Sequence, residues 1–345
     1  MKSIVRKLTK TQIFWPLVIF LGILALNGLI SGGSFFRLQI VDGHLYGRII
    51  DIFRNGSKLM LLALGMTMVL ATGGTDISVG SVMAISGAVA CTIIEGSLFP
   101  FANGSVVFAI AAAIFAGVLC GSWNGFLVSR IQMQPIVATM ILLVAGRGIA
   151  QLICKGRIVT INSPPFYFIN GGYILGLPFP VYIVVALSLL VLLVVRKTAF
   201  GLYVESVGCN GEASRYSGIN SARIKFFIYI LCGTLAAVAG LIESAGIKGA
   251  DANNAGLMIE LDAILAVAIG GSSLSGGRFS LLSSLVGALI IQSITTSILS
   301  LGIAPEVNLV VKAVVVIAIC LAQSPVFQQS ISAFRAKIKK QEVVA

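Results

Sequence analysis

Residues 105–128 of the chain read SVVFAIAAAIFAGVLCGSWNGFLV, a run of 24 residues without a charged side chain. A helix crosses the hydrocarbon core of a bilayer with about 20 mostly apolar residues. This run is therefore long enough to span a membrane as one α-helix. Similar stretches recur at residues 13–31, 57–73, 79–95, 135–153, 180–195, 226–245, 260–271, 281–301 and 307–323. We predict an all-α, polytopic integral membrane protein of about ten transmembrane helices, of which the eighth is short.

The composition supports this prediction. Hydrophobic residues make up 57% of the chain and charged residues only 10%, whereas a soluble domain carries about 25% charged residues. The net charge of +12 is spread between the apolar runs and does not line one helix face, so we expect no nucleic-acid partner. The partner of most of the surface is the lipid bilayer.

The positive charges favour a topology with both termini in the cytoplasm. With the N-terminus inside, the inner segments carry 15 Lys and Arg residues and the outer segments carry 7. Cytoplasmic loops of membrane proteins show this excess of Lys and Arg. We therefore expect a single transmembrane domain over residues 1–345. Its longest cytoplasmic segment between spans is 196–225, which we expect to be helical from Gly211 to Tyr216.

The sequence lacks the common catalytic and metal-binding patterns. The six cysteines form no C-x-x-C pair, and His44 is the only histidine, so we predict no metal site. There is no phosphate-binding G-x-x-x-x-G-K-[ST] loop and no H-E-x-x-H motif. The few carboxylates are scattered along the chain. These observations indicate a conduit through the membrane and not an enzyme, without catalytic residues.

Two glycine-rich stretches resemble each other and suggest an internal repeat. One contains Gly73, Gly74, Asp76 and Ser78; the other begins at Gly270 and Gly271. Paired glycines break helices and allow close backbone approach, and in transporters such interruptions often lie on the substrate path. A tight turn at the cytoplasmic face is the slightly favoured interpretation. The alternative is a break in the middle of the membrane that forms a hinge of the translocation path.

Several polar residues next to or within apolar runs have two explanations each. Asp262 precedes an apolar run, where the dipole of a helix N-terminus stabilises a carboxylate. Alternatively, Asp262 and Asp76 line a polar path for the hydroxyl groups of a substrate. Asn124 lies on such a path or makes an interhelical hydrogen bond. Arg147 lies within a span, and it either extends to the outer interface or pairs with a carboxylate.

Two of these motifs resemble the ribose-type permeases of ATP-binding-cassette (ABC) importers. Residues 73–81, GGTDISVGS, are similar to the family's GGIDLSVGS stretch, from which Thr75 departs. Residues 261–278, from LDAILAV to SGGR, resemble its second characteristic motif. The resemblance covers about residues 40–320. Finer details resemble the galactofuranose permease subunits of the family at residues 42–47, 144–153 and 249–257.

The resemblance implies a division of labour among several chains. It implies that residues 1–345 form the permease domain of a sugar importer, in the inner membrane of a bacterium. The implied partners are a cytoplasmic ABC ATPase, a periplasmic sugar-binding protein and a second permease subunit, which is either the same or a different chain. This chain is expected to hold no cofactor, because the partner ATPase binds the ATP.

A short motif in segment 196–225 matches the helix on which the ATPase of many ABC importers docks. The family pattern is E-A-A-x-x-x-G, and the chain has Glu212, Ala213, Ser214 and Gly218 at these positions, with Ser214 as a departure. Small residues let such a helix fit into a partner's groove, and a glycine ends it. The alternative for these residues is an ordinary solvated loop helix.

Two other functions remain open at this point. A stand-alone secondary transporter or channel would couple transport to ions through acids such as Asp76 or Asp262 and would need no ATPase. A membrane anchor without a path is disfavoured by the polar interruptions. The sequence specifies neither the sugar nor the identity of the second permease subunit.

Overall fold

The structure is a computed structural model that describes residues 12–31, 33–41, 43–98, 104–302, 307, 309–314 and 317. The chain divides into two compact units between Ser293 and Ile294. The fold and the site discussed below belong to the first unit. The predicted tenth span and both termini lie outside the described residues for the most part, so their placement stays a prediction.

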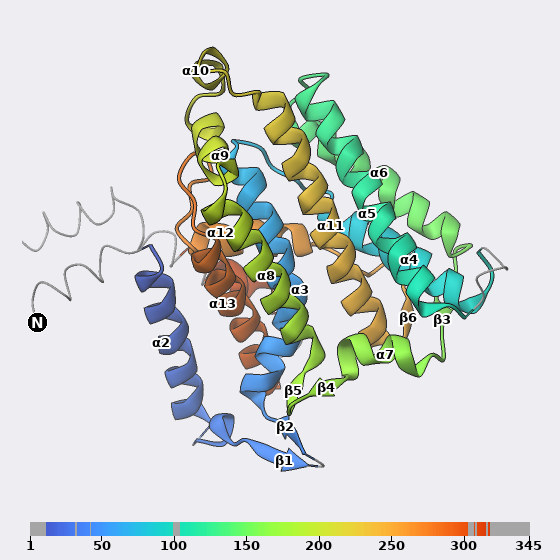
Figure 1. Cartoon of the computed structure of the whole chain (residues 1–345). Helices are drawn as coiled ribbons and strands as arrows, with labels where there is room; N and C mark the ends of the chain where they lie inside the picture. The colour runs from blue at the N-terminus through green and yellow to red at the C-terminus, as the bar shows by residue number, and fades with distance from the viewer. Residues whose placement is uncertain are drawn as a thin grey trace, which may run out of the picture. The chain divides into compact units, whose positions relative to one another are not determined.

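The described part of the chain is mainly helical (Figure 1). The helices are α2 (Phe14–Ile30), α3 (Arg48–Ala71), α4 (Val79–Glu95), α5 (Val106–Ser129), α6 (Pro135–Ile153), α7 (Pro164–Gly171), α8 (Phe179–Lys197), α9 (Phe200–Cys209), α10 (Gly211–Tyr216), α11 (Ser221–Ile247), α12 (Ile259–Ile269) and α13 (Leu281–Ser300). A 3₁₀ turn, η1, covers Ser34–Phe36. Each of the first nine predicted spans coincides with one of these helices, which confirms a helical, membrane-type architecture.

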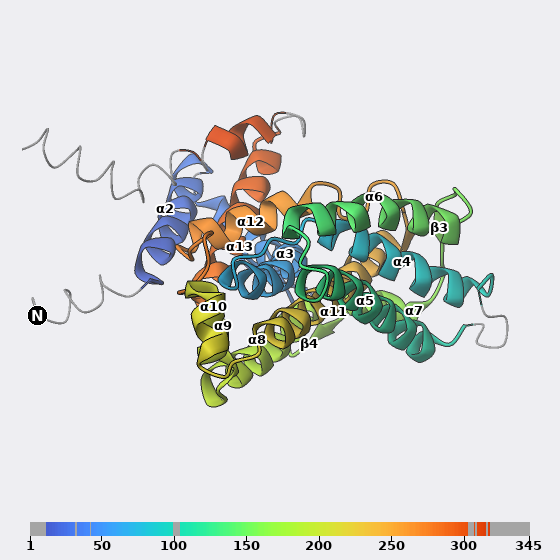
Figure 2. The same ribbon diagram turned by 90° about the horizontal axis from the view of Figure 1, so that it is seen from above.

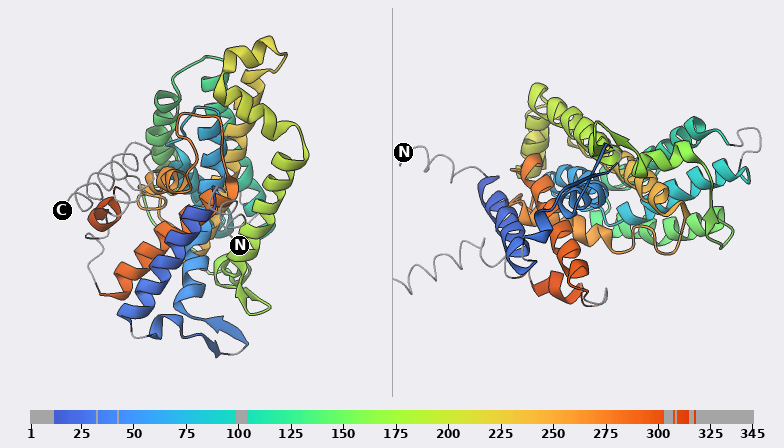
Figure 3. Two further views of the ribbon diagram at one scale, coloured as in Figure 1. Left: turned by 90° about the vertical axis from the view of Figure 1, so that its left-hand side faces the viewer. Right: turned by 90° about the horizontal axis from the view of Figure 1, so that it is seen from below.

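The short strands lie at the connections between helices. Strand β1 (Gln39–Val41) pairs with β2 (His44–Tyr46), and β4 (Tyr173–Ile174) pairs with β5 (Leu177–Pro178), in two antiparallel hairpins. Strand β3 (Val159–Thr160) pairs with the distant β6 (Gly249–Ala250). Figures 1 and 3 show hairpin β1–β2 at one end of the bundle and α10 at the other. With the predicted topology, the hairpin end faces outward and α10 faces the cytoplasm.

Five of the described helices are long and apolar enough to cross a membrane: α5, α6, α8, α11 and α13. They differ in how much protein covers them. In the most apolar window, 61% of α11 is buried but only 17% of α8. Helix α11 is therefore central, whereas α8 exposes most of its apolar surface, as expected for a helix that faces lipid. Figure 2 shows α4, α5 and α6 grouped along one side of α11.

Glycines allow α5 and α11 to approach closely. Gly117, Gly121 and Gly125 lie at intervals of four residues on α5, and a Cβ at any of them would collide with α11. The colliding atoms include backbone oxygens of Gly233 and Tyr229. In lipid, where apolar surface gives no association energy between helices, such small residues permit the backbone contact that holds helices together. The glycine spacing on α5 thus explains why α11 lies at the centre.

The lengths of some elements differ from the prediction. Helix α3 begins at Arg48, nine residues before the predicted start of the second span, because its outer end is polar and does not show in the apolar pattern. Helix α12 has 11 residues, which at 1.5 Å per residue span only about 16 Å. The predicted eighth span is therefore a half-length helix that cannot cross a bilayer by itself.

Candidate functional site

A buried polar cluster lies where the chain leaves α3 and enters α4. The Asp76 carboxylate accepts hydrogen bonds from the Ser78 backbone amide (2.9 Å) and the Ser78 hydroxyl (2.6 Å). The side-chain amide of Asn124, on α5, donates to the Ser78 hydroxyl (2.8 Å) and to Asp76 (3.4 Å). All three residues are at most 1% exposed. The structure thus brings together three of the residues that the sequence singled out.

Two further helices hold the same segment. The Thr139 hydroxyl on α6 accepts a hydrogen bond from the Ile77 backbone amide (3.3 Å), and the Tyr229 hydroxyl on α11 donates to the Thr75 carbonyl (3.3 Å). Asn124 lies five residues before the end of α5, about 8 Å from that end. Asp76 and Ser78 are therefore buried between helices, whereas Gly73 at the start of the same stretch is exposed. The choice between a tight turn at the cytoplasmic face and a break in the middle of the membrane stays a prediction.

The half-length helix α12 begins close to the Gly73–Ser78 break between α3 and α4. After α11 and strand β6, residues 251–258 turn back into the bundle, and a Cβ on Gly80 would collide with the Gly256 carbonyl and the Glu260 carboxylate. The N-termini of α4 and α12 therefore meet inside the protein. One Glu260 carboxylate oxygen is buried without a hydrogen-bond partner among the residues that the structure describes.

Arg147 fixes the returning segment. Its guanidinium donates to the backbone oxygens of Ala252 (3.1 Å) and Ala255 (2.5 Å). The sequence led us to expect that Arg147 extends to the interface or pairs with a carboxylate, and these contacts with backbone carbonyls are neither. A backbone carbonyl is present in every residue, so the sequence cannot show which carbonyls an arginine will bind. At the outer end of the segment, the hydrogen bond from the Asn254 side chain lowers the pKa of Asp251 below its usual value.

The second glycine-rich stretch is built differently from the first. Gly270 packs on the backbone of Ser283 and Ser284, and Gly271 and residues 273–275 are exposed. This stretch is a loop between α12 and α13 whose central residues are exposed. Asp262 lies in the first turn of α12, where the helix dipole stabilises a carboxylate.

The predicted cytoplasmic helix forms as expected, from Gly211 to Tyr216. The Asn210 side chain caps it by accepting hydrogen bonds from the backbone amides of Glu212 and Ala213. Glu212 is exposed and Ser214 is buried. Gly218 follows the helix with φ +84°, a conformation that favours glycine. Tyr216 is 91% exposed at the end of the helix.

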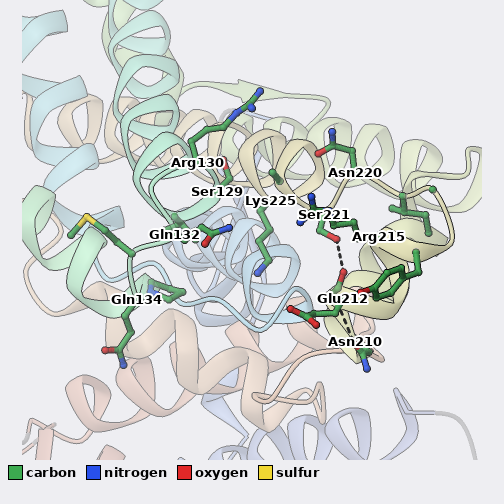
Figure 4. A pocket seen from close by; sticks show the side chains of 18 residues that line it. Ser129, Arg130, Gln132, Gln134, Asn210, Glu212, Arg215, Asn220, Ser221 and Lys225 are labelled. Atoms are coloured by element: carbon green, nitrogen blue, oxygen red, sulfur yellow. Dashed lines mark hydrogen bonds between the residues drawn. The ribbon is translucent and has the colours of Figure 1, made fainter.

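A pocket of about 1210 Å³ lies beside this helix, between it and the α5–α6 connection (Figure 4). Arg130, Arg215 and Lys225 contribute positive charge to its lining, and Glu212 contributes the one carboxylate. Ser129 also lines the pocket, and its hydroxyl is buried without a partner among the described residues. This end of the bundle thus combines a short helix with an adjacent, mainly basic hollow.

Sequence reasoning missed several residues of this arrangement. Thr139 and Tyr229 are single polar groups on apolar helices and give no motif, although a hydroxyl within an apolar run is a weak signal for an interhelical hydrogen bond. Lys58, which was counted with the outer segments, forms an ion pair with Glu243 between α3 and α11. Within the described residues, no group of three His, Cys, Asp or Glu side chains is placed to hold a metal ion.

Comparison with known proteins identifies close relatives. Residues 48–320 match the family model described as "Branched-chain amino acid transport system / permease component". The galactofuranose transporter permease protein YtfT of Escherichia coli K12 is 48% identical over 335 residues, which cover 96% of each chain. The fructose import permease FruF of Bifidobacterium longum is 40% identical over 94% of this chain and 90% of its own length. The ribose import permease RbsC of E. coli K12 is 35% identical over 80% and 85%. No solved structure matches the chain.

Proposed function

Because the chain belongs to the family of branched-chain amino acid transport system permease components, we propose that it is the membrane-spanning permease subunit of an ATP-driven sugar importer. The observation that carries the sugar assignment is the likeness to three permeases whose names specify sugars. The match of 48% over 96% of both chains favours galactofuranose as the sugar. The permease conducts the sugar and leaves ATP hydrolysis to a separate chain.

The chemistry of the break suits a neutral, hydroxylated substrate. Ser78, Asn124 and Thr139 offer uncharged hydrogen-bonding groups at one level of the bundle. The buried Asn124 carbonyl oxygen has no hydrogen-bond partner among the described residues, so it is available to a donor such as a sugar hydroxyl. We propose that the translocation path passes the Gly73–Ser78 break and that Gly73, Gly74, Gly270 and Gly271 provide conformational freedom at the ends of the helices.

The ATPase docks on α10 in this proposal. The helix is short, capped at both ends and followed by a glycine, and it carries the exposed Glu212 and Tyr216. Exposed aromatic side chains are frequent anchors of protein interfaces. The adjacent basic pocket offers Arg130 and Lys225 to an acidic segment of the ATPase. A second permease subunit, the same or a different chain, and a periplasmic sugar-binding protein complete the importer in the bacterial inner membrane.

The test is reconstitution into lipid vesicles together with the partner ATPase and the sugar-binding protein of the same importer. We expect uptake of galactofuranose that requires ATP on the ATPase side. Ribose, fructose and leucine are the competing substrates in this assay. Uptake of leucine in place of a sugar would show that the transported substrate is an amino acid. Uptake by this chain alone, driven by a proton or sodium gradient, would contradict the proposal and indicate a secondary transporter.

Docking on α10 is tested by replacing Glu212 with Arg. We expect the ATPase to be lost on purification from mild detergent, because the replacement reverses a charge on the proposed contact surface. Replacing Glu205 with Arg is the control, since this carboxylate belongs to the same cytoplasmic segment but lies on α9. Equal recovery of the ATPase with both variants would refute the docking assignment.

A further inference from the structure

Three backbone segments meet next to the predicted cytoplasmic helix, mainly through backbone atoms. They are Ala71–Gly73 at the end of α3, Gly208 and Cys209 at the end of α9, and residues 275–277 in the loop between α12 and α13. We call this contact the glycine junction. A Cβ on Gly208 would collide with the Ala71 carbonyl oxygen and the Gly277 amide nitrogen. Only Asn210 separates α9 from α10.

Hydrogen bonding and glycine conformation confirm that the contact is tight. The Gly277 amide donates to the Ala71 carbonyl oxygen (2.9 Å). A Cβ on Gly276 would lie 2.8 Å from the Gly208 carbonyl oxygen and 3.0 Å from the Gly73 nitrogen. Gly276 has φ +94° and Gly277 has φ +89°, which other residues rarely adopt. Each of the three segments therefore touches the other two through backbone atoms.

Such a contact is suited to transmitting movement. Side chains can absorb a displacement by changing rotamer, whereas backbone in direct contact has no such freedom and must move with its neighbour. Ala71 directly precedes the break that contains Asp76. The loop of residues 275–277 connects α12 to α13. The glycine junction thus links the end of α9, next to the cytoplasmic helix, to both glycine-rich stretches.

We propose that the glycine junction transmits the displacement of α10 to the Gly73–Ser78 break and to the α12–α13 loop, and that its three segments move as one body. This inference rests on the proposed docking of the ATPase on α10. It assigns Gly208 as a positioning residue that acts through the backbone of Ala71 and Gly277.

Replacement of Gly208 by Ala tests the proposal, with Gly148 to Ala, in helix α6, as the control. Alanine favours the helical conformation over glycine, so neither replacement weakens its helix intrinsically. A Cβ on Gly208 would collide with backbone, whereas a Cβ on Gly148 would have no neighbouring atom within 4 Å. The two variants therefore differ in crowding at the junction and not in chemistry.

In vesicles with ATPase and binding protein, we expect Gly208→Ala to retain the ATPase and to hydrolyse ATP, but to transport less sugar for each ATP hydrolysed. The expected loss is about tenfold, within the usual range for coupling between two sites. Gly148→Ala should keep the ratio of sugar transported to ATP hydrolysed that the unmodified protein shows. Equal ratios for the two variants would overturn the proposal. Absence of ATP-dependent uptake by the unmodified protein would instead refute the proposed function.

A reversible cross-link tests whether the junction moves as one body. The native Cys209 sulfur lies 3.0 Å from the position of a Cβ on Gly277, so a sulfur on that Cβ can come within about 2 Å of it, the length of a disulfide bond. We expect oxidised Gly277→Cys protein to transport as well as the same protein after reduction. Gly277→Cys with Cys209→Ser, which cannot form the bond, is the control for the oxidant.

Loss of transport on oxidation, with recovery on reduction, would show that the segments separate during transport and would overturn the one-body mechanism. If Gly208→Ala fails to assemble with the ATPase, the cross-link still tests the proposal, because it compares the oxidised and reduced states of the same protein. Cross-linking should reach the same yield with and without nucleotide trapped in the ATPase. A yield that falls in the nucleotide-trapped state would contradict the proposal as well.

Discussion

Replacing Arg147 by Met is expected to loosen residues 251–258 while the surrounding helices stay folded. Methionine keeps most of the length of the side chain but removes the guanidinium, which donates to the carbonyl oxygens of Ala252 and Ala255. Both alanines are buried, with 5% and 8% exposure, so their oxygens would lose these partners in a place that water scarcely reaches.

The size of the effect follows from these two contacts. A hydrogen bond to a charged group contributes about 1.5–3 kcal/mol. Because Arg147 is only half-buried, the lower limit applies to each contact, which gives about 3 kcal/mol for both. That free energy corresponds to an increase of about a hundredfold in the population of the open segment.

Hydrogen–deuterium exchange in detergent measures this opening. The Ala255 amide donates to Asp251 (2.9 Å) and the Leu257 amide to Asn254 (3.1 Å), so peptides from residues 251–258 report on the segment. Replacement of Gln151 by Met is the control. This residue contacts Asn253 of the same segment, but at an exposed position (2.6 Å), where the hydrogen bond contributes only about 0.5 kcal/mol. Similar exchange in the two variants would refute the assigned role of Arg147.

Two further predictions concern the buried cluster and the ion pair. Replacement of Asn124 by Leu is expected to abolish sugar transport while the ATPase still copurifies, because the Ser78 hydroxyl loses its amide donor; normal uptake by this variant would exclude Asn124 from the path. Replacement of Lys58 by Met leaves the Glu243 carboxylate half-buried without its ion-pair partner, and it should lower the thermal stability of the purified complex. The combined exchange Lys58→Glu with Glu243→Lys should recover most of that stability, and failure to recover would show that the pair contributes little.

The apolar pattern of the sequence was sufficient to locate the helices but not their interruptions. Residues 105–128 have no charge and coincide with α5 to within a residue. The outer end of α3 and helix α9 carry charges and polar groups, so the same criterion failed there. Helix α12 was found as a short span, but its position as a half-helix depends on the return of residues 251–258, a long-range packing arrangement that local sequence does not contain.

The candidate site was predictable where one motif contained its members. Asp76 and Ser78 stand two residues apart, and Asn124 stood out as an amide in an apolar helix; the structure joins all three. Thr139 and Tyr229 come from separate helices and had no motif. The two glycine-rich stretches looked equivalent in sequence. Yet Asp76 and Ser78 of the first are buried, with hydrogen bonds to α5, whereas residues 273–275 of the second are exposed.

The hydrogen bonds of the break also bear on the choice between ATP-driven and ion-coupled transport. An interruption within a membrane helix leaves backbone groups that must find partners inside the protein. The amides of Ile77 and Ser78 find Thr139 and Asp76, and the carbonyl of Thr75 finds Tyr229. Asp76 is therefore occupied in shaping the break.

A carboxylate that binds and releases a coupling ion must instead exchange its partners in every cycle. If Asp76 did so, the Ser78 amide and hydroxyl would lose their acceptor each time, at a cost of about 1–3 kcal/mol for each buried group. Asp76→Asn distinguishes the two roles, because asparagine keeps an acceptor oxygen for Ser78 but cannot carry a proton or bind a cation as a carboxylate does. We expect this variant to retain ATP-dependent uptake with the same dependence on external pH as the unmodified protein. Complete loss of uptake with normal ATPase assembly would favour ion coupling through Asp76.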